Sequence, residues 1–176
     1  MNLAFGRCRD INGPLMEAAL ALYRSSFPAH ELRLPPDQRD VMSDPLYHFD
    51  MCLLDGALAG LILYWDFGTY IYVEHFCVEP SLRGHGLGTL ILAELARQNK
   101  TIILEIDPLT TAIAHKRLRF YQSMGFHANP WAHHHPSYHQ GIADHELLVL
   151  SYPQPIGERQ YQQFARDLGH EVMGRE

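Results

Sequence analysis

The chain has 176 residues, of which 47% are hydrophobic and 19% are charged, and its formal net charge is −6 at pH 7. This length and composition are typical of one folded globular domain and exclude a disordered chain. The negative charge, and a sequence without any run of Lys and Arg that could neutralise a phosphate backbone, argue against a nucleic-acid partner.

Three features bear on the compartment. The three cysteines, Cys8, Cys52 and Cys77, form no CxxC pair, a pattern that favours free thiols in a reducing compartment. Residues 1–15 mix apolar and charged side chains and lack the apolar core of a signal peptide. The longest apolar run, Ala57–Trp65, is too short to cross a bilayer. We therefore expect a soluble, cytoplasmic protein with no membrane partner.

The first predicted element is a helix over Ile11–Phe27. Pro14 suits its first turn, and apolar side chains recur at helical spacing up to Phe27. Prolines then predict a loop over 28–36, which contains His30, Glu31 and Arg33. A second, weaker helix is expected over 37–43.

Three strands are predicted next. Residues 49–54 and 57–67 read as a hairpin joined by the turn Asp55-Gly56. Residues 69–78 read as a third strand whose side chains alternate between two faces. One face is expected to carry Tyr70, Tyr72, Glu74, Phe76 and Val78. The other is expected to carry Ile71, Val73, His75 and Cys77.

The middle of the chain alternates helices and strands. A glycine-rich turn over 83–88 leads into an apolar helix ending near Gln98. The apolar run 101–106 is typical of a buried strand. Thr110 or Thr111 can cap a following helix that runs to Met124 and stops at Gly125.

The last segments are less regular. An irregular, histidine-rich stretch over 127–144 precedes a predicted strand over 145–152. Apolar residues at helical spacing in the polar tail predict a helix that could pack on its own domain or on a partner, such as a second copy. We expect one domain over 1–152 and a tail over 153–176. The order of elements predicts an α/β fold of the α+β type, with a mixed sheet flanked by helices.

The glycine-rich segment Arg83-Gly84-His85-Gly86-Leu87-Gly88 runs from a strand into a helix. Three positions without side chains let successive amides and the helix N-terminus converge on one point, which favours a phosphate group. A Walker loop would need a lysine that this segment lacks. A dinucleotide-binding GxGxxG fits poorly, although Glu105 stands near the distance of a ribose-binding acid. A glycine turn without any ligand is the remaining alternative.

The segment resembles the R/Q-x-x-G-x-G/A pyrophosphate loop of the GCN5-related N-acetyltransferase (GNAT) superfamily. The preceding Tyr72–Pro80 resembles the central strand of that family and its exit. Downstream, Arg117–Phe126 resembles the family pattern R-x-x-F-Y-x-x-x-G-F. The likeness covers roughly residues 10–152. It implies a mixed, mostly antiparallel sheet with a central parallel β-α-β unit.

The resemblance also implies an activity and a co-substrate. It predicts transfer of an acetyl group from acetyl-CoA to a primary amine of a small molecule or protein, by direct attack and without a metal. A family Asn is replaced here by Ala114. The residues expected to bind acetyl-CoA are Phe76, Cys77, Val78, Arg83, Gly84, His85, Gly86, Leu87, Gly88 and Thr89.

Three residues are candidates for catalysis. Direct attack needs a base for the protonated amine and an acid for the leaving thiolate. The resemblance assigns the base to Glu74, acting through a water, with Tyr72 as a helper, and the acid to Tyr121. The alternatives are that Glu74 is a salt-bridged or solvated strand residue and that Tyr121 is core packing. Cys77 is interpreted as buried filler rather than a nucleophile.

The histidines of 127–145 include three consecutive ones, His133–His135, which cannot all point at one ion from a strand. We therefore expect no metal and interpret this segment as part of the acceptor pocket, with Trp131 and Tyr138 as walls. Glu31, in the loop after the first helix, is the third expected acceptor-binding residue. A non-catalytic sensor of acyl-CoA is the alternative function.

Overall fold

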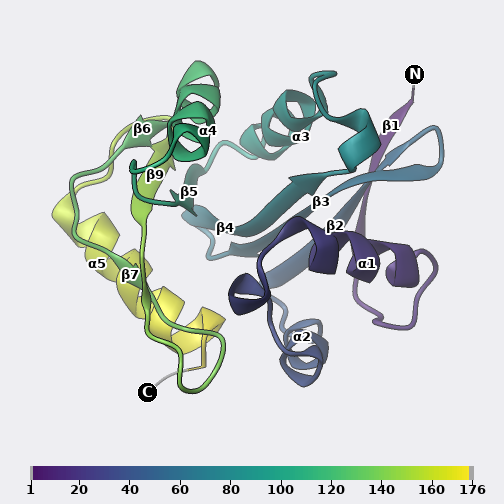
Figure 1. The fold of residues 1–176 in the computed structure, drawn as a ribbon, viewed down its shortest axis with the longest axis horizontal. Helices are drawn as coiled ribbons and strands as arrows, with labels where there is room; N and C mark the ends of the chain where they lie inside the picture. Colours follow the sequence, from purple (N-terminus) through teal and green to yellow (C-terminus); the bar gives the residue numbers. More distant parts are fainter. Residues whose placement is uncertain (1, 175–176) are drawn as a thin grey trace. The chain divides into compact units, whose positions relative to one another are not determined.

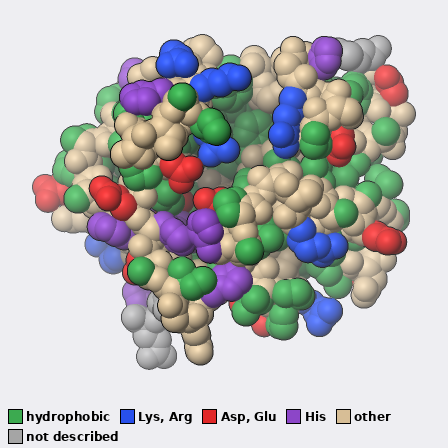
Figure 2. Space-filling model, viewed as in Figure 1, with side chains coloured by type: hydrophobic (Ala, Val, Ile, Leu, Met, Phe, Trp, Pro, Cys, Tyr) green, Lys and Arg blue, Asp and Glu red, His purple; other side chains and the backbone are tan. Residues whose placement is uncertain are grey.

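The computed structural model describes residues 2–174. Its contacts divide the chain into two compact units, Met1–Lys100 and Thr101–Glu176. No helix among the residues described is long and apolar enough to span a membrane. On the face seen in Figure 2, acidic and basic side chains are interspersed rather than gathered into one patch of either sign.

An antiparallel sheet of strand order β1-β2-β3-β4 forms the centre of the first unit (Figure 1). Its strands are β1 (Leu3–Cys8), β2 (Tyr47–Leu54), β3 (Ala57–Asp66) and β4 (Tyr70–Val78). Its helices are α1 (Met16–Ser26), α2 (Pro35–Val41) and α3 (Leu87–Ala96), with the short 3₁₀ turns η1 (Ala29–Glu31) and η2 (Pro80–Leu82).

The N-terminal part differs from the prediction. Strand β1 was not predicted, and α1 begins at Met16 rather than Ile11. Leu15, just before the helix, has a φ of 65°, a left-handed conformation that an α-helix cannot contain. Pro14 therefore lies outside the helix instead of in its first turn. The predicted hairpin is confirmed, because Asp55 and Gly56 both have positive φ, of 50° and 85°, at the turn between β2 and β3.

Helices α1 and α3 cover opposite faces of this sheet. Tyr23 of α1 packs edge-on against His75 of β4, with ring centroids 4.9 Å apart. Gly60 of β3 belongs to the other face, where a Cβ would lie 3.1 Å from Ile91 of α3 and 2.8 Å from the Cys77 carbonyl oxygen. Only glycine fits at this position without movement of the backbone.

The second unit contains a smaller antiparallel sheet of order β5-β9-β6 and a separate pair, β7-β8. Its strands are β5 (Thr101–Ile106), β6 (His127–Ala128), β7 (His134–His135), β8 (His145–Glu146) and β9 (Leu148–Tyr152). Its helices are α4 (Ala112–Ser123) and α5 (Glu158–Asp167), the latter continued by the π-helical turn η3 (Leu168–Val172).

In this unit the start of α4 is as predicted, whereas the strand predicted over 145–152 is divided in two. Thr111 caps α4, because its hydroxyl accepts a hydrogen bond from the Ala114 amide at 3.1 Å, and Gly125 follows the helix with a φ of 95°. The predicted strand 145–152 is wrong as one element, since β8 pairs with β7 and β9 pairs with β5. Overall, the predicted mixed α/β fold is confirmed, and β4, α3 and β5 follow one another as the expected β-α-β succession.

Candidate acetyl-CoA site and its neighbourhood

The glycine-rich loop connects the end of β4 to the start of α3. Gly84 and Gly86 have φ of 82° and 80°, and a Cβ added to either would meet nothing within 4 Å. Gly86 is the N-cap of α3, and no side chain caps this helix start. The loop therefore adopts a shape that favours glycine, and the space beside it is open.

The amides of this loop are available to an anion. Within residues 2–174, the main-chain N–H groups of residues 84–89 contact no acceptor in the protein. Those at the start of α3 also lie at the positive end of the helix dipole. Arg83 is exposed, and its Nε donates to the Val78 carbonyl oxygen at 3.1 Å, which holds the guanidinium beside the loop. This donor set fits a diphosphate.

The two faces predicted for the strand over 69–78 are wrong beyond its centre. In the β3–β4 register, Leu63 lies opposite His75 but Tyr64 lies opposite Val73, so Glu74 is an extra, bulged residue. One inserted residue reverses the alternation, and Tyr72 now shares a face with His75 and Cys77 instead of with Phe76.

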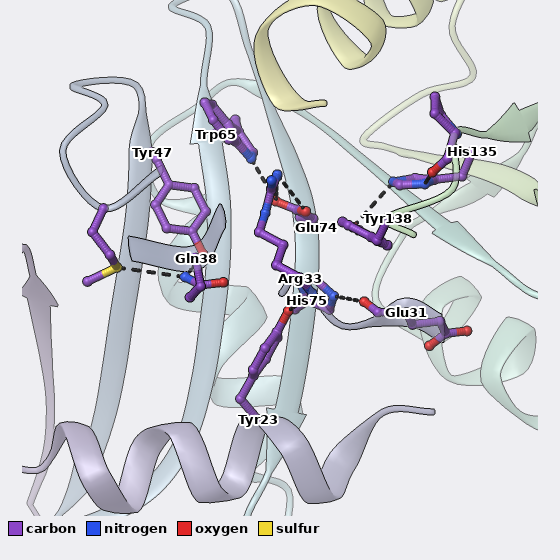
Figure 3. Close-up of polar contacts among 12 residues, drawn as sticks. Tyr23, Glu31, Arg33, Gln38, Tyr47, Trp65, Glu74, His75, His135 and Tyr138 are labelled. Atoms are coloured by element: carbon purple, nitrogen blue, oxygen red, sulfur yellow. Dashed lines mark hydrogen bonds and ion pairs between the residues drawn. The ribbon is translucent and has the colours of Figure 1, made fainter. Parts of the chain in front are cut away.

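Glu74 is an ion-paired residue inside the first unit (Figure 3). Its Oε2 lies 2.9 Å from Nη2 of Arg33, and its Oε1 accepts a hydrogen bond from the Trp65 indole nitrogen at 2.8 Å. The Glu74 side chain is 0% exposed, whereas the residue as a whole is half-buried, so its exposed part is main chain. The bulge thus turns the carboxylate inward.

The other candidate residues of β4 are buried or half-buried. Tyr72 is buried opposite Trp65 of β3. Phe76 and Val78 are half-buried, and the Cys77 thiol is buried. Burial raises the pKa of Cys77, which keeps the thiol protonated at neutral pH and accords with a packing role.

Tyr121 lies in the last turns of α4, in the second unit. It is half-buried, with the rings of Phe120 and Phe126 at centroid distances of 5.2 and 5.5 Å. Burial raises the pKa of Tyr121 to about 12, and Arg117 opposes this shift. The phenol is therefore protonated at neutral pH, as a proton donor must be.

The three expected acceptor-binding residues differ in their environments. Glu31, in η1, has a side chain 34% exposed, and its carbonyl oxygen accepts a hydrogen bond from Nε2 of His75 at 2.8 Å. In the second unit, the Trp131 indole donates to the Ile156 carbonyl oxygen at 3.3 Å and stacks on Tyr161, so this ring also packs the tail. The Tyr138 hydroxyl lies 3.4 Å from Nε2 of His135.

Sequence reasoning missed two buried polar clusters. The sequence did not indicate that Arg33 and Trp65 contact Glu74. It also did not indicate that His133 contacts Glu105 and Tyr161. Nε2 of His133 lies 2.6 Å from Oε2 of Glu105, and its Nδ1 lies 2.8 Å from the Tyr161 hydroxyl oxygen. A lone carboxylate in an otherwise apolar strand, as at 74 and 105, was the available signal, since such a group requires a partner.

Among residues 2–174, no three or more His, Cys, Asp or Glu side chains gather into a group that could hold a metal ion. Two buried histidines of the second unit, His133 and His135, instead contact other groups of the protein. His135, for example, is buried and its Nδ1 lies 2.7 Å from the Pro136 carbonyl oxygen.

Comparison with known proteins shows which proteins this chain resembles. Residues 47–128 match the model of the acetyltransferase (GNAT) domain. The inferred acetyltransferase YjbC of Bacillus subtilis is 30% identical over 104 residues, or 57% of this chain and 52% of the relative. The match therefore spans about half the length of that protein.

Solved structures extend the likeness to nearly the whole chain. An inferred GNAT-family acetyltransferase from Bacteroides thetaiotaomicron superposes with a TM-score of 0.91 at 26% identity, covering 98% of this chain and 99% of the other. An aminoglycoside 6′-N-acetyltransferase complexed with coenzyme A shares the fold, with a TM-score of 0.61, 18% identity and coverage of 88% and 99%. The chain thus resembles GNAT acetyltransferases over residues 47–128 in sequence and over nearly its whole length in fold.

Proposed function

We propose that this protein transfers an acetyl group from acetyl-CoA to a primary amine of a small molecule or peptide by direct attack. The observation that carries the proposal is the row of unpaired amides at 84–89, shaped by Gly84 and Gly86 and flanked by Arg83. These groups would hold the diphosphate of the co-substrate. Binding of coenzyme A by the solved relative of the same fold supports the proposal.

The remaining contacts to the co-substrate are assigned to the end of β4. Phe76, Cys77 and Val78 would line the path of the pantetheine arm, and the main-chain N–H near Val78 would polarise the thioester carbonyl. The half-buried state of Phe76 and Val78 supports this assignment, because a ligand could reach these residues from solvent.

Glu74 is proposed to take the proton of the attacking amine through a water, with Tyr72 assisting. Its contact with Arg33 keeps the carboxylate ionised, as a base must be, and its place at the bulge puts exposed main chain beside it. Tyr121 is proposed to protonate the leaving thiolate. Its raised pKa keeps the proton in place until a stronger base, the thiolate in an apolar environment, develops.

Replacing Tyr121 with Phe tests the acid role. The variant removes only the hydroxyl, so the ring contacts with Phe120 and Phe126 are retained. We expect turnover to fall about 10²-fold, since positioned acids contribute at least that much, while the affinity for acetyl-CoA stays unchanged. Steady-state thiol release and calorimetry measure the two quantities. Wild-type turnover in Tyr121→Phe would remove the hydroxyl from the mechanism.

The amine acceptor is proposed to contact Glu31, Trp131 and Tyr138. Support comes from the partly exposed carboxylate of Glu31, which could pair with a cationic amine. Trp131 has a second, structural role in holding the tail, so its replacement should also lower stability. A cytoplasmic location and a homodimer remain predictions.

One observation favours a second candidate, a non-catalytic sensor of acyl-CoA. The Glu74 side chain is 0% exposed and ion-paired with Arg33, an environment that lowers its affinity for a proton. Thiol release from acetyl-CoA, measured against polyamines, aminoglycosides, amino acids and peptides, separates the candidates. The enzyme predicts release with at least one acceptor class, whereas binding of acetyl-CoA without release on any of them would support the sensor.

A further inference from the structure

The first unit contains a buried ion pair between Arg33 and Glu74. Nη2 of Arg33 lies 2.9 Å from Oε2 and 3.2 Å from Oε1 of Glu74, and the two side chains are only 6% and 0% exposed. Burial of two charges is costly, and an apolar pair of similar volume is often at least as stable. A fully buried pair on the strand that leads to the cofactor loop therefore calls for a role other than stability.

Other polar groups around the pair reinforce the ionised state of Glu74. The Trp65 indole donates to Oε1 at 2.8 Å, and the Arg33 guanidinium lies 5.9 Å from the Trp65 ring centroid. Burial, and next the negative charge of Glu74, raise the pKa of both Tyr23 and Tyr47, so these phenols face Glu74 in their neutral form. His75 follows Glu74 on β4 and donates to the Glu31 carbonyl oxygen.

The main chain around Arg33 is fixed as well (Figure 3). The Arg33 amide donates to the Tyr23 hydroxyl oxygen at 2.8 Å, and the carbonyl of Glu31 is held by His75 at 2.8 Å. The loop before α2 is thus attached to α1 and to β4 close to Arg33. The guanidinium is therefore preorganised toward Glu74 and needs no rearrangement to pair with it.

We infer that Arg33 is a positioning residue, which keeps the Glu74 carboxylate ionised and oriented at the β4 bulge and so sets the pH range in which Glu74 can accept a proton. The inference deepens the proposed function and rests on it. A carboxylate buried here without a cation would take up a proton near neutral pH, because burial disfavours its charged form. The same contact makes Glu74 a weaker base. Arg33 therefore lowers the proton affinity of Glu74 and widens the pH range over which its carboxylate is ionised.

Trp65 provides a direct test, because its indole N–H reports on the carboxylate that it contacts. The sequence has two tryptophans, and Trp131, in the second unit, donates to a main-chain carbonyl and serves as an internal reference. We would follow both indole ¹H–¹⁵N resonances between about pH 5 and about pH 8. In the wild type the Trp65 resonance should stay constant. In Arg33→Gln it should titrate, with a midpoint about 1–3 pH units above that of the wild type.

Three matched variants complete the test. Arg33→Lys keeps the charge but not the fork geometry of the guanidinium, so its midpoint should lie above that of the wild type and below that of Arg33→Gln. Should Arg33→Gln not fold, a midpoint in Arg33→Lys equal to that of the wild type would overturn the inference. In Glu74→Gln, and in the double variant Arg33→Gln/Glu74→Gln, the Trp65 resonance should stay constant, because no carboxylate remains beside the indole to titrate. A constant Trp65 resonance in Arg33→Gln, or a transition that survives in the double variant, would overturn the inference.

The same variants separate this inference from the proposed function. Titration of Trp65 in Arg33→Gln, together with full turnover in Glu74→Gln, would retain the ionisation role of Arg33 and remove Glu74 as the base. Loss of turnover in Glu74→Gln without any titration in Arg33→Gln would retain the base and reject Arg33 as its control.

Discussion

Replacing Gly86 with Val is expected to weaken coenzyme A binding by about 100-fold. With a φ of 80°, residue 86 is strained for any β-branched side chain, and the new side chain would occupy the open space beside the loop amides. Hydrogen bonds from main-chain N–H groups to a charged phosphate contribute about 1.5–3 kcal/mol each, so loss of one or two of them accounts for this change in affinity. Isothermal titration calorimetry with coenzyme A measures it.

The matched control is Gly68→Val, at the turn between β3 and β4. Gly68 has a φ of 89°, and a Cβ there would also meet nothing within 4 Å, so the backbone strain is the same as at Gly86. Both variants should lose similar thermal stability, but only Gly86→Val should lose coenzyme A. Equal affinities in the two variants would show that the loop does not hold the diphosphate.

Replacing Glu74 with Gln is expected to lower turnover about 10²-fold or more, because the amide cannot accept the proton of the amine. The affinity for acetyl-CoA should remain within about threefold of the wild-type value, since the proposed diphosphate contacts lie elsewhere. The fall in activity that protonation of Glu74 causes in the wild type, expected below about pH 5, should also disappear. Thiol release across a pH series, with the best amine of the panel, measures both effects.

Glu74→Gln also leaves Arg33 buried without its counter-charge, which costs about 3–5 kcal/mol. Thermal unfolding must therefore accompany the kinetics, and turnover must be measured well below the unfolding temperature. Asp50→Asn is a suitable control, because Asp50 is another half-buried strand carboxylate and lies on the opposite face of the sheet from Trp65. Turnover at the wild-type level in folded Glu74→Gln would exclude this residue as the base.

Local signals were sufficient for much of the fold. The Asp55-Gly56 turn, the strand Thr101–Ile106 and the Thr111 cap depend on residues that are close in sequence, and the structure confirms them. The glycine pattern at 84–88 likewise predicted an uncapped helix start with free amides, because glycine spacing directly constrains the local backbone.

Features that depend on distant partners could not be predicted. The bulge at Glu74 exists only relative to β3, and a single strand carries no sign of which residue will be left unpaired. Arg33 meets Glu74 across 41 residues, so the sequence could indicate that Glu74 needs a partner but not that Arg33 supplies it. Strand β1 was missed because its charged residues obscured the apolar alternation, and β8 and β9 were joined because they are separated only by Leu147.

The bulge explains why the sequence suggested a more accessible base than the structure contains. A regular strand would have kept Glu74 on the face of Phe76 and Val78, which are half-buried. The bulge instead directs its carboxylate to Arg33 and Trp65. Kinetics of the Glu74 and Arg33 variants, taken together, decide between two roles of the Arg33–Glu74 ion pair. It serves catalysis, or it only holds the loop before α2 in place.

The central claim is that the amides of residues 84–89 and Arg83 bind the diphosphate of a thioester carrier. Calorimetric titration of the folded wild-type protein with coenzyme A, and in parallel with NAD, tests it most directly. We expect saturable binding of coenzyme A and none of NAD. A folded protein that leaves coenzyme A unbound, or that binds NAD in its place, would contradict it.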